Sequence, residues 1–491
     1  MKAMLIAMGA AMVLAAPGLA RAETACADLA KTPLAHAEVT SATAEKSGTV
    51  DLCKIAVTSR PTKDSDIRLE VWIPVGGAWN GKFVQLGNGG FAGTVPSGRL
   101  KAIAATGYAT AGTDDGHQDP VGTSATWALG HPEKITDFGY RALKETTDIA
   151  KALIKAQKLG GPKTSYFYGC SDGGREALME AQRYPNDFDG IVAGAPANYM
   201  SELFGVSAAN QQALHQPGGY LDLPQLKLLQ AAALADCGGA TFVRDPAACR
   251  FDPGKLLCKA GQADGCLTAA QVHSARTIYA GRADPRTGKV AFPGFTAGAE
   301  AQGGSWQAWT TGSTPAANGN AAGYQFASNA FKYFAFQDPN YDLLTMDLGT
   351  GFDGAKAKMS SIIDSPDANL AAFKKRGGKL IQYHGWNDPA IPARSSIVYY
   401  EDVGRTMGDT SGFYRMYLIP GMLHCAGGPG PGTVDWLAVL DGWVAGGKAP
   451  AELTATMTAA GGDPKQLLCP YPGVAREDGK GGWACSVKKK G

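Results

Sequence analysis

Apolar and polar positions alternate along the first part of the chain in short runs that are typical of β-strands. Residues 67–74 read IRLEVWIP, the alternation of a strand with one buried face. Further strand-like runs cover 82–86 and 108–111, and short apolar or aromatic runs follow at 165–168 and 190–194. The return of such runs predicts a β-sheet built from this part of the chain.

Helical patterns lie between these runs. Between about residues 137 and 158, apolar side chains recur at helical spacing: Tyr140, Leu143, Ile149, Leu153 and Ile154. Residues 176–181, EALMEA, are strong helix formers. Strands that alternate with helices predict an α/β fold with a mostly parallel sheet.

The pattern changes in the middle of the chain. Residues 201–370 are rich in Ala, Gly, Gln and Asn, contain four cysteines and show no clear strand rhythm. Strand-like runs return at 379–383 and 413–419. We therefore predict one α/β domain, formed by residues 23–200 and 371–491, into which 201–370 is inserted as a lid. An independent second domain is the alternative.

The first 22 residues have the form of a secretory signal peptide. Lys2 is followed by an apolar run from Met4 to Ala16 and by a small-x-small site that ends at Ala22. The apolar run is shorter than the roughly 20 residues that a membrane span needs. We expect cleavage after Ala22 and a secreted or periplasmic protein without a membrane anchor.

Ten cysteines in an exported chain indicate disulfides. Sequence alone permits many pairings, but closeness along the chain suggests four, which leaves Cys170 for Cys425. The four local pairs are Cys26–Cys53, Cys237–Cys249, Cys258–Cys266 and Cys469–Cys485. No pair has Cys-x-x-Cys spacing, which argues against zinc or thioredoxin chemistry.

Charge argues against nucleic acid as a partner. The chain has 46 basic and 44 acidic residues, and cleavage after Ala22 removes Lys2 and Arg21, which leaves equal numbers. A balanced chain has no general attraction for a polyanion, and no basic stripe is present. The basic run Lys488–Lys490 is expected to be a solvated end.

A serine stands where a catalytic nucleophile would. Gly169-Cys170-Ser171-Asp172-Gly173 reads Gly-x-Ser-x-Gly between a predicted strand and a predicted helix, the context of a nucleophile elbow. Asp388 and His424 each follow a predicted strand, in the chain order Ser, Asp, His of α/β-hydrolases. We predict Ser171 as nucleophile, His424 as general base and Asp388 as the residue that orients it.

Other residues compete for these roles. The motif around Ser171 also arises by chance in glycine-rich chains, and Asp115 and Asp137 are alternatives to Asp388. The other six histidines are not expected to catalyse. We expect His117 and His131 to be buried near the site, His384 to lie beside it, and the rest to be structural or at the surface: His36, His215 and His273.

An oxyanion hole needs two backbone N–H donors. The residue after the nucleophile, Asp172, supplies one, and an earlier loop supplies the other. The glycine-rich run 87–93 is the natural loop because glycine lets the backbone approach a substrate, and we choose Gly89 within it. The same run is a weak match to a dinucleotide-binding motif, because the chain lacks the acidic residue that this motif requires further along.

These motifs resemble those of the tannase and feruloyl esterase family. The segment 168–190, YGCSDGGREALMEAQRYPNDFDG, is similar to that family's nucleophile segment. The similarity covers most of the chain after residue 22. Further matching segments are 79–83, 87–93, 113–117, 131–134, 137–138 and 383–386. The family also includes the enzyme that cleaves mono(2-hydroxyethyl) terephthalate.

The resemblance implies an α/β-hydrolase fold with a lid that shapes the acyl pocket. It also implies the same three catalytic residues, Ser171, Asp388 and His424, and a disulfide between Cys170 and Cys425. The substrates it implies are small-molecule esters of aromatic acids, such as gallate, ferulate, caffeate, coumarate or a terephthalate monoester.

The chain departs from the family at the lid. Many members have a calcium site in a loop dense in aspartates, whereas Asp245 is the only carboxylate between Cys237 and Cys249. Calcium takes six to eight oxygen ligands, several of them usually anionic. We expect no metal and no cofactor here.

The lid also bears on the substrate. Residues 311–370 contain no arginine to hold a free carboxylate on the acyl ring, although Lys332 or an arginine elsewhere can substitute. Four phenylalanines are candidates for an aromatic pocket, but core packing is the alternative that we favour for most of them. They are Phe326, Phe331, Phe334 and Phe336.

Taken together, these features predict a secreted serine carboxylesterase for aromatic acid esters. Hydrolysis of a terephthalate monoester is the alternative within the same chemistry. A catalytically silent protein that holds phenolic ligands is the alternative from another class, and a peptidase is disfavoured because nothing indicates an extended peptide cleft.

Overall fold

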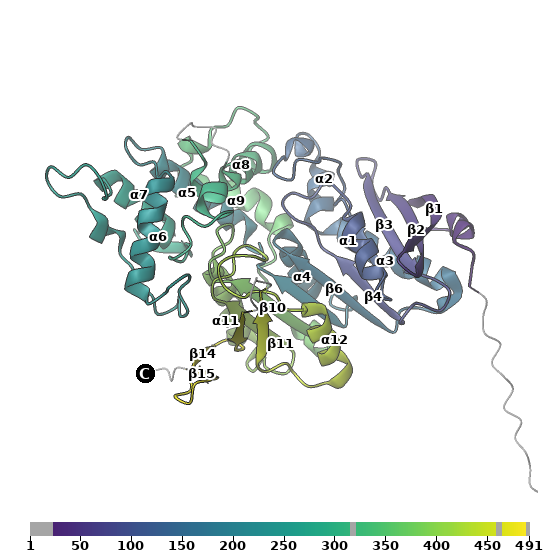
Figure 1. Cartoon of the computed structure of the whole chain (residues 1–491). Helices are drawn as coiled ribbons and strands as arrows, with labels where there is room; N and C mark the ends of the chain where they lie inside the picture. Colours follow the sequence, from purple (N-terminus) through teal and green to yellow (C-terminus); the bar gives the residue numbers. More distant parts are fainter. Residues whose placement is uncertain (1–22, 315–320, 458–463, 488–491) are drawn as a thin grey trace, which may run out of the picture.

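The computed structural model describes residues 23–314, 321–457 and 464–487 (Figure 1). The predicted signal peptide, residues 1–22, and the basic run Lys488–Lys490 lie outside the described residues. No described helix has the length and apolar character that crossing a membrane requires.

A nine-stranded sheet forms the centre of the molecule. Its strands run in the order β1-β2-β3-β5-β4-β6-β7-β10-β11. The pairs from β1 to β5 are antiparallel and those from β5 to β11 are parallel. The bounds are β1 Ala37–Ser47, β2 Val50–Ser59, β3 Ile67–Pro74, β4 Lys82–Leu86, β5 Ala109–Thr113, β6 Thr164–Cys170, β7 Gly190–Gly194, β10 Lys379–Gly385 and β11 Tyr414–Ile419.

Helices cover both faces of this sheet, and the pleat of each strand supplies both cores. In β4, Phe83 belongs to the apolar core under α3 and α4, while Val84 belongs to the core under α1 and α12. Buried positions on both faces give the parallel strands their nearly continuous apolar sequences. The helices are α1 Ser97–Ala104, α3 Ala142–Ile154, α4 Asp172–Arg183, α11 Ala393–Met407 and α12 Trp436–Gly446.

The insertion between β7 and β10 is mainly helical. It leaves the sheet at the carboxyl end of β7 and returns to it at the amino end of β10, and Figure 1 shows its helices on the side of the molecule away from β1 and β2. The elements are α5 Met200–Leu214, α6 Leu223–Cys237, α7 Ala269–Ala280, α8 Ala322–Asn329, α9 Thr350–Ile363, α10 Ala371–Lys375 and the strands β8 Gly281–Ala283 and β9 Val290–Pro293.

One apolar cluster joins this insertion to the sheet domain. Phe91, from the loop after β4, and Phe138, from η3, pack against Phe334 of the insertion at ring distances of 5.2 and 6.0 Å. A second cluster lies within the insertion, around Leu229 and Trp306. The insertion therefore shares part of its core with the domain into which it is inserted.

The C-terminal residues add two small hairpins beside β11. These are β12 Leu453–Thr456 with β13 Lys465–Leu468, and β14 Gly473–Glu477 with β15 Trp483–Val487. Short helical segments complete the chain: η1 Cys26–Lys31, η2 Thr126–Ala128, α2 Pro132–Thr136, η3 Asp137–Arg141, η4 Lys155–Leu159, η5 Pro253–Leu256, η6 Gln307–Thr311, η7 Ala330–Ala335 and η8 Leu343–Thr345.

Candidate active site

The turn between β6 and α4 presents Ser171. Strand β6 ends at Cys170 and α4 begins at Asp172, and the serine between them has φ 68° and ψ −123°, a strained backbone for a residue other than glycine. A Cβ on Gly169 would lie 2.2 Å from the carbonyl oxygen of Gly173. The Gly-x-Ser-x-Gly spacing is therefore a packing requirement of a serine presented at this turn.

The three predicted residues form one hydrogen-bonded chain. Ser171 Oγ lies 2.9 Å from His424 Nε2, and His424 Nδ1 lies 2.7 Å from Asp388 Oδ2. Asp388 follows β10 and His424 follows β11, and these neighbouring strands are parallel, so both loops lie at the same edge of the sheet. With its proton on Nδ1, His424 donates to Asp388 and accepts from the serine hydroxyl.

Asp388 is held as a carboxylate. It is fully buried, and its Oδ1 accepts hydrogen bonds from the backbone N–H groups of Ala390 and Ile391 at 2.8 and 2.9 Å. Burial would raise the pKa of this carboxyl group, but the charges and hydrogen bonds of His424 and His384 hold the pKa well below its usual value. Asp388 is therefore ionised through the neutral range.

A second buried histidine, His384, also contacts the Asp388 carboxylate. Its Nδ1 lies 2.7 Å from Ser396 Oγ, and its Nε2 lies 3.0 Å from the Ile391 carbonyl oxygen and 3.2 Å from Asp388 Oδ2. The buried imidazole contacts Asp388 and makes no hydrogen bond to Ser171, so it lies beside the site.

The competing residues are engaged elsewhere. Asp137 forms an ion pair with Arg141 at 2.5 Å, and Asp115 belongs to a buried cluster beside α4. His131 lies 2.7 Å from Asp64, and its side chain is 49% exposed. The expectation that His131 is buried is wrong, because it ends a surface loop at the start of α2.

Gly89 and Asp172, the two predicted oxyanion donors, come from segments that are hydrogen-bonded to each other, since the Gly173 N–H donates to the Asn88 carbonyl oxygen at 2.8 Å. Asp172 is the first residue of α4, where backbone N–H groups have no acceptor within the helix. Gly89 is exposed, and a Cβ there would meet nothing within 4 Å. Neither N–H donates to a backbone carbonyl or side chain of the described residues. Both donors are available for a ligand.

A disulfide joins the neighbours of the serine and the histidine. Cys170 and Cys425 are bonded with a Cα–Cα distance of 6.0 Å, and Cys425 Sγ lies 3.8 Å from His424 Nε2. The four local pairs are also present in the structure: Cys26–Cys53, Cys237–Cys249, Cys258–Cys266 and Cys469–Cys485.

A pocket of about 570 Å³ opens over Ser171 and His424. Trp309, which comes from η6 in the insertion, lines this pocket, and its ring meets the His424 ring edge-on at 5.1 Å. Phe326 of α8 stacks on Trp309 at 6.2 Å, whereas Phe331 and Phe334 are buried in the core as we favoured. The insertion thus supplies aromatic surface at the candidate site.

Arg99 of α1 also lines this pocket, together with Tyr168, Tyr383 and the Cys170–Cys425 disulfide. Its guanidinium carbon lies 6.0 Å from the centre of the Tyr168 ring. Arg99 makes no ion pair or side-chain hydrogen bond with another described residue. No local pattern in the sequence singles out Trp309 or Arg99, because both reach the site through tertiary packing.

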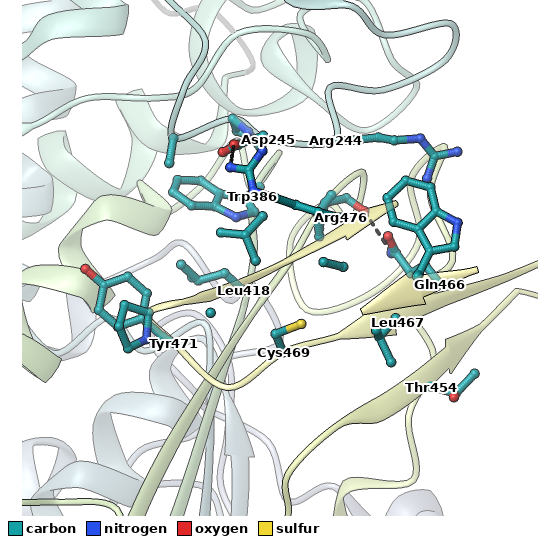
Figure 2. Close-up of a pocket in the computed structure, with 18 of the residues that line it drawn as sticks. Arg244, Asp245, Trp386, Leu418, Thr454, Gln466, Leu467, Cys469, Tyr471 and Arg476 are labelled. Atoms are coloured by element: carbon teal, nitrogen blue, oxygen red, sulfur yellow. Dashed lines mark hydrogen bonds and ion pairs between the residues drawn. The ribbon is translucent and has the colours of Figure 1, made fainter. Parts of the chain in front are cut away.

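A second pocket, of about 490 Å³, lies between the insertion and the C-terminal hairpins (Figure 2). Arg476 crosses it to pair with Asp245 at 2.9 Å. Asp245 is the single carboxylate of the loop between Cys237 and Cys249, so its charge is already compensated. This pocket contains none of the three triad residues.

The sheet, the strained serine turn and the Ser-His-Asp arrangement at the carboxyl ends of its strands define an α/β-hydrolase. The chain belongs to the tannase and feruloyl esterase family, since the model of that family, described as "Tannase and feruloyl esterase", matches residues 53–490. It is accordingly a carboxylic ester hydrolase that acts on small-molecule esters.

Similarity to known proteins, in sequence and in structure, supports this family membership. An uncharacterized esterase of Xanthomonas campestris pv. campestris is 36% identical, over 94% of this chain and 90% of that protein. A probable feruloyl esterase B-2 of Aspergillus terreus is 31% identical, over 90% of this chain and 87% of the relative. The crystal structure of feruloyl esterase B from Aspergillus oryzae superposes with a TM-score of 0.85 at 28% identity, over 94% and 99% of the two chains.

Proposed function

We propose that this protein is an exported serine esterase that hydrolyses esters of aromatic acids through an acyl-enzyme. The hydrogen-bonded chain Ser171–His424–Asp388 carries the proposal. A hydroxyl that donates to an imidazole, whose other nitrogen donates to a buried carboxylate, is an activated nucleophile. The five disulfides support export, since such bonds persist in oxidising compartments.

In the first half of the reaction, Ser171 Oγ attacks the ester carbonyl while His424 Nε2 takes its proton. The carbonyl oxygen gains negative charge and accepts hydrogen bonds from the N–H groups of Gly89 and Asp172. The C–O bond to the alcohol then breaks, and His424 returns the proton to the departing alkoxide. The acyl group remains bonded to Ser171.

In the second half, water attacks the acyl-enzyme and gives its proton to His424. The Ser171–acyl bond breaks, the serine oxygen recovers the proton and the free acid leaves. Asp388 stabilises the imidazolium in both halves because its carboxylate stays ionised next to His424 Nδ1.

The aromatic surface above the site supports an aromatic acyl group. Trp309 and the Phe326 ring stacked on it provide a flat apolar surface beside His424, against which a phenolic ring packs well. The names of the relatives point the same way. We also propose that the loop between Cys237 and Cys249 binds no calcium, because Asp245 is paired with Arg476.

A substrate panel tests this proposal. We expect the highest kcat/KM for methyl ferulate or methyl gallate and a much lower value for methyl esters of aliphatic acids of similar size. Equal turnover of aromatic and aliphatic esters would contradict the acyl preference. A serine-directed phosphonate separates an enzyme from a silent binding protein, because only an activated serine becomes labelled.

One observation favours the terephthalate monoester as a second candidate. Arg99 lines the pocket without an acidic partner among the described residues, so it is an available cation for a free carboxylate. The arginine-free stretch 311–370 therefore does not by itself disfavour a negatively charged substrate.

A further inference from the structure

Three buried carboxyl groups lie directly behind the predicted oxyanion loop. Asp115, Asp172 and Glu176 are each at most 1% exposed, and each places an oxygen within 4.8 Å of the others. Asp115 follows β5, while Asp172 and Glu176 belong to the first turns of α4. Buried carboxylates are costly unless a cation or a proton compensates their charge.

The Arg175 guanidinium lies close to this cluster and pairs with Asp172. Arg175 Nε lies 2.5 Å from Asp172 Oδ1, and the other guanidinium nitrogens donate to Asp172 Oδ2 and to the carbonyls of Phe138 and Gly139. Arg175 has no hydrogen bond to Asp115 or Glu176 among the described residues. The remaining two carboxyl groups therefore need another source of compensation.

Asp115 and Glu176 both hold Asn88, the residue before Gly89. The Asn88 backbone N–H donates to Glu176 Oε2 at 3.0 Å, and Asn88 Nδ2 donates to Asp115 Oδ2 at 3.0 Å. The other oxygen of each carboxyl group, Asp115 Oδ1 and Glu176 Oε1, is buried without a donor in the described part of the chain. The two carboxyl groups place oxygens within 4.8 Å of each other.

Two buried carboxyl groups this close together do not both ionise readily when no cation lies between them. Burial, with the neighbouring Asp172 charge, raises the pKa of Asp115 to about 7. Burial and the charges of Asp115 and Asp172 raise the pKa of Glu176 well above its usual value. The Arg175 charge opposes both shifts, so Asp172 and Arg175 are the neighbouring charged groups that act most strongly on the pair.

We propose that Asp115 and Glu176 share one proton, and that this proton fixes Asn88 and thereby the Gly89 N–H that binds the oxyanion. The proposal rests on the proposed function, because it assigns a task to Gly89. Asp115 and Glu176 are positioning residues: they contact the loop and not the substrate.

The geometry of one peptide unit explains the effect. The Asn88 carbonyl oxygen accepts from the Gly173 N–H at 2.8 Å, and in a trans peptide the following Gly89 N–H points the opposite way. Gly87 packs so closely that a Cβ there would lie 2.5 Å from Glu176 Oε2. Movement of the Glu176 carboxyl group would therefore shift Asn88 and turn the Gly89 N–H away from the substrate.

The shared proton makes activity sensitive to alkali. When it is lost, two adjacent buried charges repel each other and the hold on Asn88 loosens. Because the pKa values of both groups are raised in the folded protein, the stabilisation is present at low pH and is lost as pH rises through those values. We expect kcat of the wild type, corrected for spontaneous hydrolysis, to fall at least about fivefold between pH 7 and pH 10, within the 10²- to 10³-fold worth of one oxyanion donor.

Glu176→Gln tests the proton. The glutamine oxygen still accepts from Asn88, and its amide donates permanently to Asp115, so the alkaline loss of kcat should shrink to less than about twofold while kcat at pH 7 drops less than about tenfold. In Asp115→Asn the new amide donates to Glu176 in place of the shared proton, so the alkaline loss of kcat should shrink in the same way. Glu176→Ala leaves the Asn88 N–H unpaired and should lower kcat about 10- to 100-fold with little change in KM.

Glu180→Gln is the matched control. Glu180 lies one turn further along α4, is equally buried and also has a raised pKa from burial, but it makes no hydrogen bond to Asn88. It should keep the alkaline loss of the wild type. The proposal is overturned if the wild type shows no alkaline loss, or if Glu176→Gln and Asp115→Asn both retain it. Ser171→Ala distinguishes a failure of the shared-proton proposal from a failure of the proposed function. Continued activity of this variant would contradict the proposed function itself.

Discussion

His424 Nε2 lies 2.9 Å from Ser171 Oγ, across 253 residues of the chain. In the sheet, the strand before Ser171 and the strand before His424 are separated by β7 and β10. The Cys170–Cys425 disulfide is the covalent link between the two loops. It lies beside both catalytic candidates, so it restricts their relative motion directly.

Removing this disulfide should reduce activity more than it reduces folding. For Cys170→Ala/Cys425→Ala we expect kcat/KM to fall about tenfold or more, because a displacement of the order of 1 Å at a reacting group costs up to about 10²-fold. The free energy of unfolding should fall by about 2–5 kcal/mol. Ester hydrolysis and thermal unfolding measure the two effects.

The control for this prediction is Cys258→Ala/Cys266→Ala, which removes a disulfide within the insertion. It should leave kcat/KM within about twofold of the wild type, because neither cysteine lines the pocket over Ser171. If mild reductant cleaves Cys170–Cys425 and activity is unchanged, the bond has only a structural role.

Asp388→Asn should lower kcat by about 10⁴-fold while the protein stays folded. The amide no longer stabilises the imidazolium and favours the wrong tautomer of His424. Asp137→Asn is the control, because Asp137 pairs with Arg141 and not with His424. A larger loss of kcat in Asp137→Asn than in Asp388→Asn would contradict the assignment of the acid.

His117 should make the folded protein sensitive to acid. Burial lowers its pKa from 6.5 to about 4, and its ring stacks on Trp127 at 3.8 Å. Between pH 6.5 and about pH 4 the unfolded chain binds a proton that the folded chain does not. The free energy of unfolding that neutral His117 contributes is therefore present above pH 6.5 and is lost as pH falls. By pH 4 the loss should reach about 2–3 kcal/mol.

Thermal unfolding between pH 4 and pH 7 measures this effect. His117→Phe should show a smaller decrease in Tm over this range than the wild type, and His131→Phe, which changes an exposed histidine, should show the same decrease as the wild type. An identical pH dependence in all three proteins would exclude His117 as the source.

Arg99 should select for esters that carry a negative charge. Arg99→Gln is expected to lower kcat/KM for mono(2-hydroxyethyl) terephthalate about 10- to 100-fold, the worth of a hydrogen bond to a charged group. Methyl ferulate, which has no carboxylate, should change less than about threefold. Lys332→Gln is the control for the other candidate cation, and an effect confined to Lys332→Gln would show that Arg99 is not the relevant charge.

Much of the sheet follows from local sequence. The runs at 67–74, 82–86 and 190–194 coincide with β3, β4 and β7, because strands buried on one or both faces have clear apolar patterns. The first two strands were not predicted. β1 is an edge strand of small and polar residues without a buried position, so its sequence resembles a loop.

The predicted helix over 137–158 is also only partly regular. Its central part is α3, but Asp137–Arg141 and Lys155–Leu159 are π-helical turns. The first of these places the Phe138 and Gly139 carbonyls within reach of Arg175. Apolar spacing alone does not reveal such a local change in helical winding.

The site was predictable where a motif fixes the backbone. Ser171 lies in a turn that only its flanking glycines permit, and the other two triad residues follow predicted strands. The sequence did not predict the roles of Trp309, Arg99 and the Asp115–Glu176 pair, because no local sequence pattern indicates which residues they contact in the folded protein. Their placement depends on how the insertion, α1 and α4 pack at the end of the sheet.

The most direct test of the account is to trap the acyl-enzyme. 4-Nitrophenyl ferulate is mixed with the enzyme, the reaction is quenched in acid within the first turnover, and the acylated residue is located by peptide mass spectrometry. We expect one feruloyl group on Ser171, and in Ser171→Ala no acylation and a kcat lower by about 10⁴-fold or more. Acylation of a different residue, or wild-type hydrolysis by Ser171→Ala, would contradict the account.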